Sequence, residues 1–223
     1  MFATVTSLPV GSDYLSSKAV AAEKKKKKRH PGKRVFLRKT CLACHGKGGV
    51  RAIQQYPNIA GQPKKYIANQ IKDILSGKRV GSKDDTGAVR TAPMTGALIT
   101  AEGKVRISDK EIKQVASWLS EQPMARPIET DTPLDEAQVK KAKKLFKKKC
   151  RSCHGKNALK PLKNYPILAG LKKAYIIAQV NDVKNKVRKN GKIKTMYPMV
   201  KKLSDEQIDL LASYISQIDP TKK

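Results

Sequence analysis

The amino-acid sequence predicts an all-α protein that contains two tandem copies of one small helical module. The first observation is a six-residue pattern that occurs as "CLACHG" from Cys41 and as "CRSCHG" from Cys150, and these two copies contain all four cysteines of the chain. The second is that the match continues at the same spacing, because "YPNIAG" aligns with "YPILAG". The third is the helical spacing of apolar residues in both copies. A repeat with a fixed period of this length indicates a duplicated domain.

The helices of the first copy can be placed in order along the chain. A short basic helix, "KRVFLRKT", leads directly into the first cysteine motif. A second helix is predicted over "KKYIANQIKDILSGK", and Gly77 is its expected end. Its apolar residues recur at helical intervals: Tyr66, Ile67, Ile71, Ile74 and Leu75. A closing helix begins after Ser108, which is expected to form a capping box with Glu111.

The second copy repeats this order. The helix "EAQVKKAKKLFKKK" precedes the second cysteine motif, and Ser204 with Gln207 predicts a capping box at the start of the closing helix. The closing helices align as "ISDKEI" and "LSDEQI", at a shorter spacing than the cysteine motifs. The first copy therefore has additional loop residues, which we place in "SGKRVGSKDDTGAVR" and "LITAEGKVR".

These elements divide the chain into four parts. We expect a flexible basic N-terminal segment over residues 1–32, a first domain over 33–120, a linker over 121–134 and a second domain over 135–223. The linker is rich in proline and acidic residues. The first 22 residues end in "AVAA", which resembles a signal-peptidase site, but they have no basic start. A remnant of an export signal and a plain tail both remain open for this segment.

The composition restricts the classes of partner. The formal net charge is +30, which implies an anionic partner such as an acidic protein, a membrane surface or nucleic acid. Nucleic-acid binding is not expected, because the lysines follow helices without interleaved aromatic residues or a recognition motif. No stretch approaches the ~20 apolar residues of a transmembrane helix. Only 39% of the residues are apolar and 5% aromatic, so a bulky cofactor is expected to complete the cores.

The repeated cysteine motif predicts the cofactor. Cysteine-x-x-cysteine-histidine is the attachment signature of covalent c-type haem, in which two thiols bind the porphyrin edge and the histidine binds the iron. We therefore expect two covalently bound haem c groups. Their thioether residues are Cys41, Cys44, Cys150 and Cys153, and their proximal iron ligands are His45 and His154. A zinc site would need a second cysteine pair nearby, and a thioredoxin-like pair belongs in a βαβ unit, so both alternatives are disfavoured.

A methionine is the expected ligand on the other side of each iron, where it favours electron transfer over the binding of small molecules. In the first domain this residue is Met94, which lies in a loop marked by proline and glycine, "TAPMTGAL". In the second domain "TMYPMVKKLSDEQ" offers Met196 and Met199, and the residues alone leave the choice open. The third histidine, His30, is expected in an exposed tail.

Together these features closely resemble the dihaem cytochrome c4 family of class I c-type cytochromes. The resemblance rests on two "CxxCHG" modules, each followed by a "YP-x-[IL]-AG" loop, a methionine segment and a closing helix that begins with "SD", and it covers roughly residues 33–218. It implies two all-helical class I cytochrome c domains, haems that face one another across the domain interface, and a histidine and a methionine on each iron. The lysine content is a departure from the family, so the partners cannot be transferred from it.

The resemblance also ranks the two methionines of the second domain. The family form "M-x-P-M-x-x-x-L-S-D" uses its first methionine as the ligand, and this position corresponds to Met196. We therefore favour Met196, with Met199 as the alternative. In the first domain, "MTG" matches the family form at Met94.

The expected function is electron transfer rather than enzymatic catalysis. The chain is predicted to carry electrons from a quinol-oxidising complex or a dehydrogenase to a terminal oxidase, with acidic docking surfaces on its redox partners, a membrane respiratory complex among them. The alternative is a haem-bearing subunit of a sulfur-compound or other periplasmic dehydrogenase complex. Covalent haem c is attached outside the cytosol, so the expected location is the periplasm.

Overall fold

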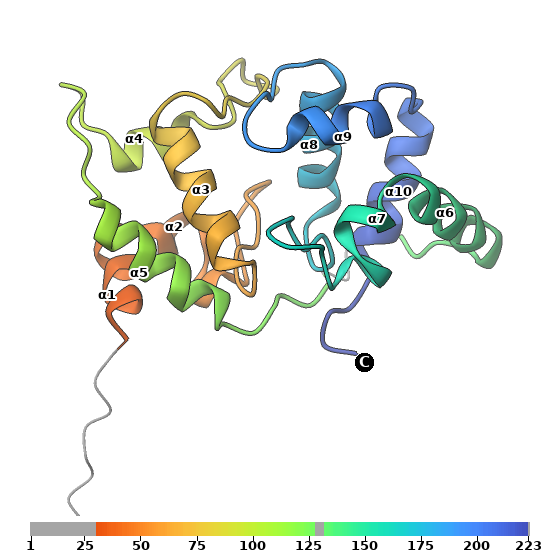
Figure 1. The fold of residues 1–223 in the computed structure, drawn as a ribbon, viewed down its shortest axis with the longest axis horizontal. Helices are drawn as coiled ribbons and strands as arrows, with labels where there is room; N and C mark the ends of the chain where they lie inside the picture. The colour runs from red at the N-terminus through yellow and green to blue at the C-terminus, as the bar shows by residue number, and fades with distance from the viewer. Residues whose placement is uncertain (1–29, 128–131, 223) are drawn as a thin grey trace, which may run out of the picture.

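The computed structural model describes residues 30–127 and 132–222, and these residues form two helical modules that lie side by side (Figure 1). The expectations for the export signal and for the lysine run after it fall outside the described residues. The first module contains α1 (Pro31–Arg38), α2 (Cys41–His45), α3 (Lys64–Leu75), α4 (Ala92–Leu98) and α5 (Asp109–Ser120). The second contains α6 (Glu136–Lys149), α7 (Arg151–His154), α8 (Lys173–Lys184), α9 (Ile193–Val200) and α10 (Asp205–Ser216).

The all-α prediction is confirmed. Short 3₁₀ helices, η1 (Lys47–Gly49) and η2 (Lys156–Ala158), follow the cysteine motifs. In the described ranges the only extended pairings are isolated antiparallel bridges, Lys83 with Val89 and Ile99 with Val105. Both bridges lie in the segments where the sequence predicts the additional loop residues of the first module.

Each module has its own buried apolar cluster, built where the first and last helices meet. In the first module, Phe36 of α1 is fully buried, and its ring lies 5.0 Å from that of Trp118 on α5. In the second, Phe146 of α6 packs 6.1 Å from Tyr214 on α10. Aromatic pairs at these separations add stability beyond the area that they bury. The helix that leads into each cysteine motif is thereby fixed against the closing helix.

Capping boxes fix the starts of three helices in the described ranges. The two predicted capping boxes, Ser108 with Glu111 and Ser204 with Gln207, are both present. A third box begins α6, where Asp135 and Gln138 exchange hydrogen bonds between their side chains and backbone N–H groups. Sequence analysis missed it, although Asp-x-x-Gln before a helical pattern is a variant of the same signal.

His30 does not lie in an exposed tail, so that expectation is wrong. It is half-buried and occupies the N-cap position of α1, where its Nδ1 accepts a hydrogen bond from the backbone N–H of Gly32 at 3.1 Å. Its Nε2 also lies 3.8 Å from a carboxylate oxygen of Glu121 at the end of α5. The next residue, Pro31, is well suited to the first helical position because that position needs no N–H donor.

The glycine that ends each cysteine motif is required by the backbone. Gly46 has φ +69°, and a Cβ there would lie 2.1 Å from the carbonyl oxygen of Arg51. Gly155 has φ +78°, and its Cβ would lie 1.9 Å from the carbonyl oxygen of Lys160. Both positions combine a left-handed conformation with close approach of another backbone segment. The repeat therefore reads "CHG" in both copies.

We predict that Gly46→Ala lowers the free energy of unfolding by at least about 2 kcal/mol, since it adds a steric clash to the cost of a left-handed alanine. Gly77→Ala is the matched control, because Gly77 has the same φ of +69° but open space around the position of a Cβ. That control should cost only about 1 kcal/mol. Denaturant unfolding of the haem-loaded variants measures both. Equal losses for the two variants would contradict the steric argument.

Buried amide side chains join the two modules. Gln62 is 4% exposed, and its side chain donates to the carbonyl oxygen of Ile167 at 2.8 Å and accepts from the N–H of the same residue at 3.0 Å. Asn58 donates to the carbonyl oxygen of Gly170 at 3.0 Å. Both bonds reach the "YPILAG" loop of the second module. The interface therefore depends on backbone groups of Ile167 and Gly170 that bond to buried amide side chains.

We predict that Gln62→Ala lowers the free energy of unfolding by about 2 kcal/mol, because it leaves the partly buried N–H and C=O groups of Ile167 without their amide partner. Denaturant unfolding of the haem-loaded protein tests this value. Asn164→Ala, at an exposed amide in the same loop region, is the control and should change little. A Gln62→Ala protein as stable as the control would show that the amide does not hold the modules together.

Candidate functional site

The cysteine motif of the first module forms the short helix α2. Its two cysteines are free thiols, and its last residue, His45, has Nδ1 2.9 Å from the carbonyl oxygen of Pro57. The Nδ1–H therefore donates to this carbonyl, which leaves Nε2 with a free lone pair for a metal ion. Burial lowers the pKa of His45 below its usual value, against the opposing effect of the hydrogen bond to Pro57. The imidazole is accordingly neutral at neutral pH, as a metal ligand must be.

The second module repeats this arrangement. His154 is 7% exposed, its Nδ1 lies 2.9 Å from the carbonyl oxygen of Pro166, and burial lowers its pKa. The ring of Tyr165 stands edge-on to that of His154 at 6.1 Å. Pro57 and Pro166 are the prolines of the repeated "YP" loops. The "YPxxAG" repeat thus supplies the carbonyl that fixes each histidine, a role that its recurrence signals but that sequence analysis did not assign.

The thiol pKa values of Cys41 and Cys150 do not favour disulfide exchange. Burial raises the pKa of Cys41 to about 11 and that of Cys150 to about 12. Redox-active Cys-x-x-Cys pairs have lowered thiol pKa values instead, so the thioredoxin-like alternative is further disfavoured. Among the described residues there is no group of three or more His, Cys, Asp or Glu side chains placed to hold a metal ion.

A cavity of about 430 Å³ brings the predicted residues of the first module together. Cys41, Cys44, His45 and Met94 all line it, although Met94 lies 49 positions after His45 in the sequence. Met94 belongs to the short helix α4 rather than to a loop, so the expected loop conformation is wrong. Pro93 does not prevent this helix because it lies in the first turn, where a missing N–H costs nothing.

The same cavity reaches the second module. Tyr175, Gln179 and Asp182 of α8 line it together with Arg79 and Arg90 of the first module. Two buried polar atoms, Nε of Arg90 and one carboxylate oxygen of Asp182, have no hydrogen-bond partner in the structure. Buried polar groups in proteins nearly always have hydrogen-bond partners. These two unpartnered atoms therefore indicate a position in the cavity where a further polar group can bind.

These features fit a covalently bound haem. The cavity offers two thiols for attachment, a neutral imidazole and a thioether for the iron, an apolar wall, and guanidinium groups that complement carboxylates. All of these groups belong to residues that line the cavity.

The second module distinguishes its two methionines by burial. Met196 packs against the apolar cluster of this module, which Cys150 also contacts. Met199 is 37% exposed. Both lie in α9, a continuous helix that contains Pro198. The structure therefore brings Met196 and Cys150 onto one cluster and directs Met199 toward solvent.

Comparison with known proteins identifies the family. The model of the cytochrome c family matches residues 30–123 and 139–219, one match for each module. A cytochrome c4 from Stutzerimonas stutzeri is 30% identical over 185 residues, which cover 78% of this chain and 82% of that protein. The chain belongs to the dihaem cytochrome c4 family. The crystal structure of reduced cytochrome c4 from Pseudomonas stutzeri matches with a TM-score of 0.66 and 28% identity, over 84% of this chain and 96% of that one.

The name of a further relative includes that protein's own redox partner. The thiosulfate dehydrogenase electron acceptor of Thiomonas intermedia is 26% identical over 189 residues, which cover 82% of this chain and 81% of that protein. As a member of the cytochrome c4 family, this chain is a dihaem electron-transfer protein, not an enzyme, and it carries two covalently bound haem c groups. In the described ranges no helix combines the length and the hydropathy that crossing a bilayer requires.

Equivalent residues of the two cytochrome domains meet at their interface. Arg79 donates to Gln70 of its own module at 3.0 Å and to Gln179 of the other at 3.1 Å. Arg188, the counterpart of Arg79 in the repeat, donates to Gln179 at 2.7 Å and to Gln70 at 2.9 Å. A bond from Arg79 to the hydroxyl of Tyr175 at 2.9 Å completes this network. The arginines are therefore held by neutral acceptors from both modules.

Proposed function

We propose that this protein carries single electrons between redox-partner proteins in the periplasm, with acidic docking surfaces on those partners. The observation that carries the proposal is that one cavity of the first module collects two thiols, the metal-ready face of His45 and the thioether of Met94. A methionine opposite the histidine leaves no open iron position for a substrate. The domains proposed to do this work span residues 33–120 and 135–223, joined by the linker 121–134.

The chain's own residues prepare each site for electron exchange. Haem bound there supplies reversible one-electron exchange between ferrous and ferric iron. Cys41 and Cys44 would hold it covalently in the first module, with His45 and Met94 as the iron ligands. The proposed residues of the second module are Cys150, Cys153, His154 and Met196. The carbonyl groups of Pro57 and Pro166 keep the histidines oriented, which lowers the rearrangement that accompanies a change of iron charge.

Two kinds of electron donor fit the comparisons. For a cytochrome c4 we propose exchange between a quinol-oxidising complex and a terminal oxidase. The relatives named as thiosulfate dehydrogenase electron acceptors favour a sulfur-compound dehydrogenase as the donor. The two alternatives differ only in the partner, because both need the same pair of haem sites.

The test is an optical spectrum with a count of haem per chain. We expect two covalent haems for each polypeptide, and in the oxidised protein the weak far-red band that marks bonding of a methionine sulfur to ferric haem iron. One haem per chain, or the absence of this band, would overturn the proposed ligand set.

A further inference from the structure

The two methionine segments differ sharply in charge. In the first module, residues 75–106, from the end of α3 to the residue before "ISDKEI", contain six basic and three acidic residues. In the second module, residues 184–202 contain eight basic residues and no acidic one. Six of these eight are exposed lysines: Lys186, Lys189, Lys192, Lys194, Lys201 and Lys202. The segment that contains the proposed methionine ligand of the second module is therefore strongly basic, as is α6, which has seven lysines and one glutamate.

Neighbouring segments extend this positive surface. From Lys156 to Leu203, the only acidic residue is Asp182, which is 1% exposed and faces the interface between the modules. Exposed Lys160 and Lys163 come from the loop that precedes Tyr165. No exposed carboxylate from these segments therefore compensates the lysines, although Asp205 and Asp209 of α10 form salt bridges with Lys184 and Lys173.

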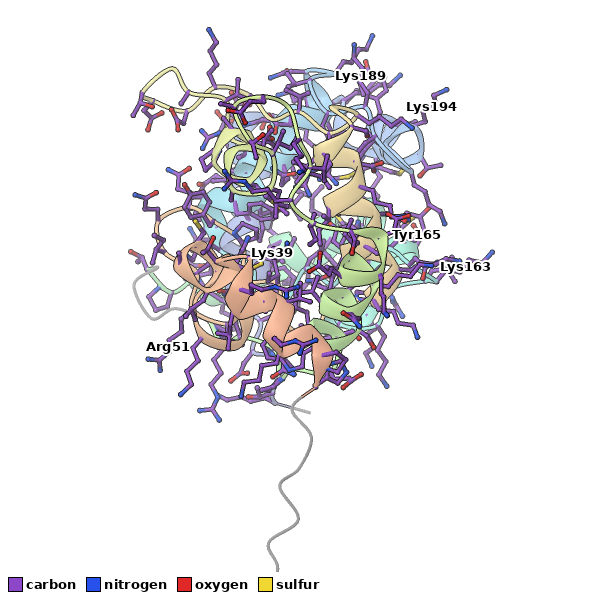
Figure 2. All side chains as sticks on the ribbon, turned by 90° about the vertical axis from the view of Figure 1, so that its left-hand side faces the viewer. Lys39, Arg51, Lys163, Tyr165, Lys189 and Lys194 are labelled. Carbon is purple, nitrogen blue, oxygen red and sulfur yellow. The ribbon has the colours of Figure 1, made fainter. Side chains whose placement is uncertain are left out.

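Aromatic contacts join the segments into one surface. Lys192 lies over the ring of Tyr165 at 4.5 Å, and the hydroxyl of Tyr165 is 3.3 Å from that of Thr195, next to Met196. Lys186 and Lys201 lie over the ring of Tyr197 at 5.3 and 5.9 Å. Cation–π contacts of this kind restrict the long lysine side chains. Figure 2 shows Lys163, Tyr165, Lys189 and Lys194 projecting on the same side of the molecule.

This surface also has exposed apolar residues. Leu162 is 55% exposed, and Val187 and Met199 are each 37% exposed. They are the large exposed apolar side chains of the second module, and each stands within two positions of an exposed lysine. Apolar contacts among charged residues are typical of protein interfaces, in which charge guides the encounter and apolar burial holds the complex.

We propose that this basic face of the second module, centred on Tyr165, Met196 and Tyr197, is the docking site for acidic redox-partner proteins. The inference rests on the proposed electron-carrier function and assigns partner exchange to one of the two modules. The edge-on contact between Tyr165 and His154 places the face directly beside the proximal histidine. The corresponding segment of the first module, residues 75–106, has three acidic residues among its six basic ones, so it would attract the same partner less strongly.

A charge-matched pair of variants separates this face from the overall charge. The test variant carries Lys163→Glu, Lys189→Glu and Lys194→Glu, at exposed lysines that stack on no ring. The control carries Lys140→Glu, Lys144→Glu and Lys147→Glu on α6, which are exposed lysines at the outer end of the second module (Figure 1). Both variants change the net charge by the same amount.

The probe is a gold electrode coated with a carboxylate-terminated monolayer, which presents an acidic surface to the haem-loaded protein. Adsorbed mass and electron-transfer rate are measured at about 10 mM ionic strength, where screening is weak. We expect the test variant to lose adsorption and electron-transfer rate by at least about threefold, and the α6 control to stay near the wild type. Haem content and the far-red band are measured first, so that a failure of the proposed function is recognised separately.

Three outcomes would overturn the proposal. Equal losses in both variants would mean that only the net charge matters, and a greater loss in the control would assign docking to α6. If the test variant keeps its electrode response but loses binding to phosphatidylglycerol–phosphatidylcholine vesicles, the face binds lipid headgroups and not an acidic protein. A Lys→Gln version of the test variant, with a smaller change in charge, should show an intermediate loss and guards against effects of the introduced carboxylates.

Discussion

Replacement of Met196 by leucine will remove the far-red sulfur band from one of the two haems and lower its reduction potential by on the order of 100 mV, since axial ligands set haem potentials over a range of ~0.8 V. Leucine fills nearly the same volume in the apolar cluster that Met196 contacts, so the fold should persist. Redox titration followed by absorbance measures the shift.

Met199→Leu is the control for this prediction. Met199 lies three positions further along α9 and is 37% exposed, so its replacement should leave the band and both potentials unchanged. The opposite result, with the band lost in Met199→Leu and kept in Met196→Leu, would show that α9 turns its second methionine to the iron when haem is bound.

The double replacement Cys150→Ala and Cys153→Ala will reduce covalent haem from two groups per chain to one. No other cysteine is available to the second module, because the remaining pair belongs to the first. A single Cys153→Ala change leaves Cys150 for one thioether bond, so haem should stay attached through one edge position. Mass spectrometry of the intact chain measures the number of attached haem groups in the unchanged protein, the single variant and the double variant.

The same double variant should also destabilise the second module. Only 39% of the chain is apolar, and we expect the cofactor to complete a core that these side chains alone leave small. Limited proteolysis should therefore cut after residue 135 before it cuts the first module. Two covalent haems in the double variant, or equal protease resistance of both modules, would contradict the assignment of these cysteines.

The helical fold and its duplication could be predicted because the signals are local and occur twice. Capping boxes at Ser108 and Ser204 and the periodic apolar residues are properties of short segments, and the structure confirms them. The conformation around Met94 was predicted wrongly. Pro93 and Gly96 indicate a loop, yet the segment forms α4, because Pro93 lies in the first turn, where a missing N–H costs nothing. The helix around Met196 was not predicted, and it forms with Pro198 in its interior.

The orientation of the histidines and the interface could not be read from the sequence, because both depend on contacts between distant segments. The carbonyl group of Pro57 reaches His45 across 12 positions, and Gln62 reaches Ile167 across 105. The residue types at these four positions do not indicate which of them pair. The recurrence of "YPxxAG" indicates that the loop matters, but only the fold shows that its backbone, and not a side chain, makes the contact.

The reciprocal bonds of Arg79 and Arg188 with Gln70 and Gln179 have a consequence for how the halves associate. Arg79 of the first half binds Gln179 of the second, and its counterpart Arg188 binds Gln70 of the first half in the same way. Such a reciprocal contact is the defining property of an isologous, two-fold interface. The chain thus keeps the pairing geometry of a homodimer within one polypeptide. Because the connecting segment holds the halves at a high effective concentration, their association does not weaken on dilution as that of two free subunits would.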